Sequence, residues 1–208
     1  MNNRDNTENN VNTTIKKENK VKLLICYHKP SYLLKDNVMT PIHVGRANAK
    51  ARMGEENKNY QWLINHMIGD DTGENISDKN DYYNEMTAVY WAWKNYEALG
   101  NPDYVGLMHY RRHFIFDEKI KDVVNVKNFD EKSYYSFLGY DEQKMSDYVD
   151  GYDFIAHIGN VPNVYQHYIR NQRKEDLDRA IDIVLQKYPD YKAYIDGYFN
   201  GSESNFCN

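Results

Sequence analysis

Two adjacent arginines between two histidines are the side chains in this sequence that point most directly to a chemical function. Arg111 and Arg112 lie between His109 and His113, just after the apolar run Tyr104–Met108. A short run of apolar and branched residues is typical of a buried strand. In open α/β sheets, ligands bind beyond the carboxyl ends of the strands. Two guanidinium groups there would suit a phosphate or diphosphate, because their paired N–H donors match its oxygens.

A solvated loop with incidental charge is the ordinary interpretation of an Arg-Arg pair. Two observations favour the anion site instead. Tyr110 and Phe114 alternate with the charged residues, and the run follows a predicted strand directly. We therefore expect a cluster of cations and aromatic rings at the carboxyl edge of a sheet.

The elements that must position this cluster follow the order strand, loop, helix, strand. Met86, Val89, Tyr90 and Trp93 recur at helical spacing and give the helix an apolar stripe. A strand-helix-strand order predicts a crossover unit, so the sheet is expected to be at least partly parallel. The predicted strands are Val21–Tyr27, Thr40–Gly45, Tyr104–Met108 and Gly151–His157, and the predicted helices are Asp81–Leu99 and Glu175–Tyr188.

Length and composition allow one domain with a polar tail. The 208 residues are 41% hydrophobic and include 20 Tyr, which is enough to build a packed core. Residues 1–20 are Asn-rich and polar, so burial cannot offset their ordering entropy and we expect a disordered tail. Residues 21–208 are expected to form one domain.

Charge, hydropathy and cysteine usage exclude several classes of protein. The formal net charge of −5 argues against a general nucleic-acid partner. No stretch approaches the length of a membrane span, and the first twenty residues lack the apolar core of a signal peptide. Cys26 and Cys207 do not look like a disulfide framework. We therefore expect a cytoplasmic protein.

Five sequence blocks carry a resemblance to a known family. They occur in the order Tyr27–Pro30, Pro41–Gly45, Asp71–Asn80, Glu85–Asn95 and Asp103–Arg112. With these blocks, the chain from Val21 onward resembles the bacterial family catalogued as domain of unknown function 4422. Its members lie among capsular and exopolysaccharide biosynthesis proteins and are regarded as glycosyltransferases. The resemblance implies an α/β, GT-A-like (Rossmann-like) fold, with a mixed, mostly parallel sheet flanked by helices, and a nucleoside diphosphate sugar as donor.

The resemblance also suggests which residues hold the donor. His28 and Lys29 follow the first strand, where a nucleotide base and ribose commonly dock in this architecture, although a plain turn before Pro30 is equally expected. The polar residues before the long helix could bind the donor or cap the helix, and Lys79 is the best ligand candidate because a cap needs no cation. The candidate donor-binding residues are Tyr27, His28, Lys29, Asn75, Asp78, Lys79, Asn80, His109, Tyr110, Arg111 and Arg112.

The expected metal ligands of a GT-A enzyme are missing at the usual place. Such enzymes commonly carry Asp-X-Asp at the end of the strand that follows the long helix, and these carboxylates hold Mn²⁺ or Mg²⁺. Here that position reads His109-Tyr110-Arg111. Either the arginines neutralise the diphosphate without a metal, or Asp70, Asp71 or Asp78 bring one in. We favour the first alternative and predict no metal; no catalytic base is identified.

Length is a second departure from the family pattern. Family members usually continue further, and Ser204–Asn208 looks like the opening of another strand, so we expect a fold that is incomplete at its C-terminus. The preferred function is sugar transfer to a polysaccharide or lipid-linked glycan acceptor, with peripheral association with the inner face of the membrane or with other polysaccharide-synthesis enzymes. The alternative is a truncated, non-catalytic module that binds a nucleotide sugar or a partner protein. A phosphoester hydrolase using His109 ranks last, because no nucleophile or metal motif accompanies it.

Overall fold

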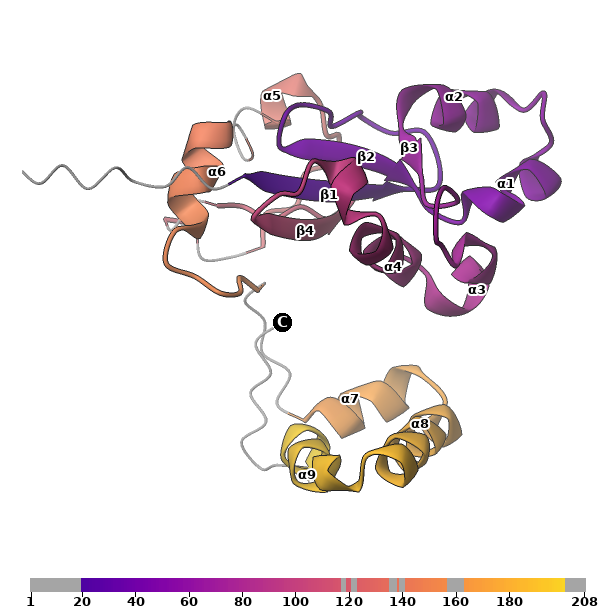
Figure 1. Cartoon of the computed structure of the whole chain (residues 1–208), viewed down its shortest axis with the longest axis vertical. Coiled ribbons are helices and arrows are strands. Elements are labelled where there is room, and N and C mark those ends of the chain that lie inside the picture. The colour runs from indigo at the N-terminus through magenta and orange to yellow at the C-terminus, as the bar shows by residue number, and fades with distance from the viewer. Residues whose placement is uncertain are drawn as a thin grey trace, which may run out of the picture. The chain divides into compact units, whose positions relative to one another are not determined.

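The computed structural model describes residues 20–116, 119–120, 123–134, 138, 141–156 and 163–200 (Figure 1). The chain divides into two compact units, with the boundary between Gly151 and Tyr152. The predicted disordered tail lies outside the described residues except for Lys20, and so does Ser204–Asn208. One domain over residues 21–208 stays a prediction.

A parallel sheet of four strands forms the centre of the first unit (Figure 1). Its strands lie in the order β3-β2-β1-β4, so β1 is an inner strand and its apolar sequence is buried on both faces. The strands are β1 (Val21–Tyr27), β2 (Met39–His43), β3 (Ile68–Gly69) and β4 (Tyr104–His109). The α/β class and three of the predicted strands are thereby confirmed, and all four strands described are parallel.

The polypeptide between β2 and β4 folds into short helices. They are α1 (Arg46–Met53), α2 (Lys58–His66), the 3₁₀ turn η1 (Ser77–Lys79), α3 (Asn80–Tyr83), α4 (Met86–Lys94) and the 3₁₀ turn η2 (Tyr96–Leu99). Helix α4 packs on the sheet, because Ala88, Trp91 and Ala92 share one core cluster with Leu24 and Ile42 of the strands. Trp91 is buried, whereas Trp93 is 69% exposed, so the two tryptophans do lie on different faces.

The prediction of one continuous helix over Asp81–Leu99 is wrong. Asn84 has a φ of 48°, in the left-handed region, which ends α3 and lets a new helix begin after Glu85. Positive φ values are uncommon for residues with a side chain, and Asn tolerates them better than most. The Asn80 side chain stabilises the break by donating to the Asn84 carbonyl at 2.7 Å. The apolar spacing therefore missed the interruption. It also misidentified the buried face, because Met86, Val89 and Trp93 are exposed and the buried residues of α4 are Thr87, Ala88, Trp91 and Ala92.

The remaining elements of the described residues are all helical. The first unit adds the single turn α5 (Glu131–Ser133) and α6 (Glu142–Val149). The second unit contains α7 (Val164–Asn171), α8 (Lys174–Lys187), the 3₁₀ turn η4 (Pro189–Tyr191) and α9 (Lys192–Asn200). Helix α8 confirms the helix predicted near Glu175–Tyr188. Within the described ranges, no helix combines the length and apolar character needed to cross a membrane.

The strand predicted over Gly151–His157 is wrong for the described part, residues 151–156, which contain no strand. Gly151 has a φ of 84° and turns the chain just after α6. Tyr152 and Phe154 are 52% and 82% exposed, so the alternating apolar residues do not face a core. His157, named as the end of that strand, lies outside the described residues.

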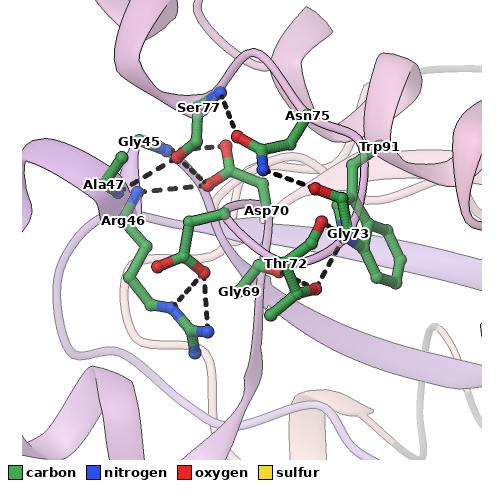
Figure 2. A network of polar contacts seen from close by, with 11 residues as sticks. Gly45, Arg46, Ala47, Gly69, Asp70, Thr72, Gly73, Asn75, Ser77 and Trp91 are labelled. Carbon is green, nitrogen blue, oxygen red and sulfur yellow. Dashed lines mark hydrogen bonds and ion pairs between the residues drawn. The ribbon is translucent and has the colours of Figure 1, made fainter.

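A buried carboxylate holds together the loops at the carboxyl edge of the sheet (Figure 2). Asp70 follows β3, and its Oδ2 accepts hydrogen bonds from the Gly45 amide at 2.8 Å and the Thr87 hydroxyl at 2.6 Å. Its Oδ1 accepts from the Arg46 amide at 3.1 Å and from the Ser77 hydroxyl. Asp70 therefore ties the start of α1 to η1 and to the first turn of α4.

The side chain of Arg46 adds a second link in the same place. Its Nε and its terminal nitrogen lie 2.7 and 2.6 Å from one carboxylate oxygen of Asp71. The guanidinium passes so close to Gly69 that a Cβ there would come within 1.9 Å of it. A side chain at position 69 would therefore displace the Arg46 guanidinium from this ion pair.

Replacing Asp70 should destabilise the protein strongly. We expect Asp70→Ala to lower the free energy of unfolding by about 3 kcal/mol or more, because four donors lose a buried acceptor at once. Urea unfolding measures the change, with Asp78→Ala as the control because the Asp78 side chain is exposed. Equal stability of the two variants would contradict this role of Asp70.

Candidate active site

The arginines singled out in the sequence lie in a tight turn at the carboxyl end of β4. The His109 amide donates to the Arg112 carbonyl at 3.1 Å, and the Arg112 amide donates back to the His109 carbonyl at 3.0 Å. Tyr110 extends the pairing with β1 by donating its amide to the Cys26 carbonyl at 3.1 Å. Arg111 and Arg112 are exposed, so this cationic turn, residues 109–112, presents both arginines to solvent.

Side chains that follow β1 gather around the ring of Tyr110. The His28 ring meets it edge-on at 5.1 Å, and the His28 Nε2 lies 3.4 Å from the Tyr110 hydroxyl. The Arg111 guanidinium lies 5.1 Å from the centre of the Tyr110 ring, and the Lys29 ammonium lies 5.9 Å from it. Both distances are within the range of cation–π attraction. The ends of β1 and β4 thus bring two cations and a histidine onto one aromatic ring.

Tyr27 supports this cluster from below. Its ring stacks on Tyr110 at 5.7 Å and is completely buried. Its hydroxyl donates to the Tyr32 carbonyl at 2.8 Å and accepts from the Leu34 amide at 3.0 Å. Burial raises the pKa of Tyr27 to about 12. The hydroxyl is therefore used within the fold, and the Tyr27 ring contributes to the cluster by packing against Tyr110.

The ring of His109 is held from both sides. Its Nδ1 accepts the Arg111 amide at 3.2 Å, which places the proton of the neutral ring on Nε2. Its Nε2 lies 3.5 Å from a carboxylate oxygen of Glu85, the residue just before α4. His109 thus connects the backbone of the cationic turn to the start of α4.

Both histidines of the cluster have lowered pKa values. Partial burial is the main cause for each of them, and the positive charge of Arg111 adds to it. Lys29 lowers the pKa of His28 further, whereas Glu85 acts in the opposite direction on both rings. At neutral pH the rings are neutral, and the fixed positive charge of the cluster comes from Lys29, Arg111 and Arg112.

The four candidates from the loop before α4 form a separate group. Asn75 donates to the Gly73 carbonyl and accepts from the Ser77 amide, so it shapes the loop. Asn80 donates to Asn84 and to the Thr87 hydroxyl, at the start of α4. The side chains of Asp78 and Lys79 are exposed. These hydrogen bonds run within the loop and to α4, and a role of the four residues in donor binding stays a prediction.

Two of the three acidic residues considered as metal ligands have other partners in the structure, and the third, Asp78, is exposed. Asp70 accepts from four donors of the scaffold, and Asp71 pairs with Arg46. Among the residues that the structure describes, no three His, Cys, Asp or Glu side chains are grouped so that they could hold a metal ion. This arrangement does not provide the carboxylate-rich oxygen set that Mg²⁺ or Mn²⁺ prefers.

Comparison with known proteins agrees with this architecture. Residues 22–208 match a family described as "Domain of unknown function (DUF4422)". The chain belongs to the DUF4422 family. It is also similar to a solved structure titled as the apo form of the WbbM bifunctional glycosyltransferase, with 38% identity and a TM-score of 0.70. The match covers 89% of this protein and 32% of the chain in the WbbM structure. The protein therefore spans about a third of the length of that relative.

These findings confirm the resemblance and support a glycosyltransferase-like role for the DUF4422 chain. The search of curated proteins found no match.

The contact between Glu85 and His109 was not predicted from the sequence, where Glu85 lies inside the single helix expected over Asp81–Leu99. A signal was present, because the helix of a parallel crossover unit runs against the strands and begins at their carboxyl edge. An acidic residue at the start of such a helix is therefore near the residues that end the strands.

A buried histidine at the same edge predicts acid sensitivity of the DUF4422 chain. His43 ends β2 opposite Tyr27, is 2% exposed, and has its pKa lowered to about 4, chiefly by burial. Between the ordinary value near 6.5 and about 4, the unfolded chain binds the proton and the folded chain does not. Stability should therefore fall as the pH falls through this window, by up to about 3 kcal/mol from this residue.

Urea unfolding at about pH 7 and about pH 4.5 measures the effect. The variant His43→Gln should lose less stability on acidification than the wild type, whereas His66→Gln on the exposed side of α2 should match the wild type. If His43→Gln lost as much stability between the two pH values as the wild type, the His43 ring would not titrate as the structure implies.

Proposed function

We propose that this chain forms the donor-binding part of a glycosyltransferase that uses a nucleoside diphosphate sugar. The observation that carries the proposal is the convergence of Lys29, His28 and the cationic turn on the ring of Tyr110. The convergence lies at the carboxyl edge of a parallel sheet, where ligands of α/β folds bind. The acceptor in this proposal is a polysaccharide or a lipid-linked glycan of capsule or exopolysaccharide synthesis.

The chemistry of sugar transfer requires stabilisation of a leaving group. The bond between the anomeric carbon and the diphosphate oxygen breaks, and its electron pair stays on the diphosphate. The acceptor oxygen forms the new bond to the anomeric carbon and loses its proton to a base. Arg111 and Arg112 would stabilise the growing negative charge, because the backbone pairing of residues 109 and 112 fixes the turn that carries them before the reaction begins.

The same cations would replace a divalent metal. In this proposal Arg111, Arg112 and Lys29 supply the positive charge that Mn²⁺ or Mg²⁺ supplies elsewhere. The scaffold contacts of Asp70 and Asp71 support this, because these carboxylates already accept donors from the chain itself. The proposed enzyme works in the cytoplasm at the inner face of the membrane, where a lipid-linked acceptor would be presented.

A second candidate function is a module that binds a nucleotide sugar or a partner enzyme without turnover. The outward face of α4 favours it, because Met86 and Trp93 are 56% and 69% exposed and Val89 lies between them. Exposed apolar groups on one helix face are typical of protein contacts. Sugar transfer by the purified chain separates the two functions, since the module binds donor and forms no product.

Loss of either arginine should weaken donor binding. We expect Arg111→Ala and Arg112→Ala each to reduce the affinity for UDP-glucose by roughly 1.5–3 kcal/mol, or about ten- to a hundredfold. Lysine at either position should restore only part of the loss, because it cannot form the two-pronged contact. Titration calorimetry measures the affinity, with Arg52→Ala on α1 as the control, since Arg52 pairs with Asp81.

Thermal unfolding without ligand distinguishes a role of the two arginines in binding from a role in stabilising the fold. Variants that melt earlier and bind UDP-glucose at wild-type strength would assign the arginines to the scaffold and remove the proposed site.

Donor binding should strengthen as the pH falls. His28 is neutral at pH 7 because its pKa is lowered, and a bound diphosphate favours its protonated form. The affinity for UDP-glucose should therefore rise between about pH 8 and about pH 5.5, with proton uptake. Calorimetry in two buffers of different ionisation enthalpy counts the protons, and His28→Gln should reduce the count. Binding with no proton uptake would place the diphosphate away from the His28 ring.

A further inference from the structure

A carboxylate stands beside the cationic turn, where it would be expected to oppose an anionic ligand. Glu85 is 44% exposed at its side chain, and its Oε1 lies 3.5 Å from the His109 Nε2. Through-space repulsion alone would make this charge unfavourable for a diphosphate held by Arg111 and Arg112. A glutamate at this position is therefore expected to have a role other than direct contact with the anion.

The hydrogen bonds of His109 supply that reason. Its Nδ1 accepts the amide of Arg111, and a neutral ring that accepts at Nδ1 carries its proton at Nε2. Glu85 faces this Nε2 and stabilises the proton there. In the other tautomer, the proton would be on Nδ1 and would point at the Arg111 N–H. Two donors would then face each other, and the turn would lose the hydrogen bond from the Arg111 amide to His109.

The backbone around Glu85 fixes its position. Asn84, with its positive φ, places Glu85 just before α4, and the Glu85 carbonyl accepts the Ala88 amide at 3.0 Å. Two residues further on, the Thr87 hydroxyl donates to the buried Asp70. The carboxylate is thus supplied from a segment that the Asp70 network anchors, and not from a freely moving loop.

We propose that Glu85 is a positioning residue of the cationic turn: by holding the proton of His109 on Nε2, it keeps Nδ1 available to the Arg111 amide and orients the turn for a diphosphate. This inference rests on the proposed donor-binding function and adds a residue to it. Its particular consequence is that an acceptor at position 85 matters more for binding than the negative charge.

Two substitutions that remove the same charge test this consequence. Glu85→Gln keeps an oxygen that can accept from Nε2–H, whereas Glu85→Leu has a similar size and no acceptor. We expect the Gln variant to bind UDP-glucose at least as tightly as the wild type, and the Leu variant to bind about tenfold more weakly than the Gln variant. Glu85→Ala repeats the comparison if the Leu variant does not fold. Glu97→Gln and Glu97→Leu are controls in which the same charge is removed from the exposed turn η2.

Histidine ¹H–¹⁵N spectra give a second readout that a general loss of stability would not produce. The wild type and Glu85→Gln should show His109 with its proton on Nε2, and Glu85→Leu should show a mixture of tautomers and a shifted Arg111 amide. Equal binding by the Gln and Leu variants, with an unchanged tautomer, would overturn the proposal. Failure of the wild type to bind UDP-glucose, with a tautomer that still depends on residue 85, would overturn the proposed function and leave the coupling of Glu85 to the turn intact.

Discussion

The pairing of β1 with β4 is the constraint on which the candidate site depends. The two strands run parallel with Cys26 opposite His109, so both end at the same level of the sheet. The residues that follow them, His28 and Lys29 on one side and Tyr110 and Arg111 on the other, then have to meet. A change of register by one residue would send Tyr110 to the opposite face of the sheet, away from Tyr27. The cluster is thus a consequence of strand pairing.

Acidic and basic residues have different uses at this edge of the sheet. Asp70 and Asp71 lie inside the loop network, where they organise the start of α1 and the first turn of α4. The cations of the turn lie at the surface, where solvent and a ligand can reach them. Glu85 joins the two regions, because it belongs to the segment held by Asp70 and contacts His109. The Asp70 network therefore helps to position the cationic turn, through the contact of Glu85 with His109.

Much of this arrangement could be predicted from the sequence, because the relevant signals are local. The apolar runs Val21–Tyr27 and Tyr104–Met108 were enough to identify the sheet and the place of the turn. The expectation that the second run is buried on both faces was wrong, because β4 lies at the edge of the described sheet and Met108 is its one buried residue. The break at Asn84 was missed, because the apolar spacing from Met86 to Trp93 lies wholly after it and carries no signal of the interruption. The role of Asp70 was also missed, since its four donors come from three separate segments of the chain. The strand predicted after Gly151 failed because alternation predicts a strand only where one face is buried.

The account depends on a diphosphate binding to the cationic turn without a divalent metal. The most direct measurement is a titration of the ¹⁵N-labelled chain with UDP-glucose in EDTA, followed through the backbone amide signals. The account predicts saturable shifts that are largest at His28, Lys29 and residues 109–112. Absence of shifts until Mg²⁺ or Mn²⁺ is added, followed by shifts centred on Asp70, Asp71 and Asp78, would contradict it.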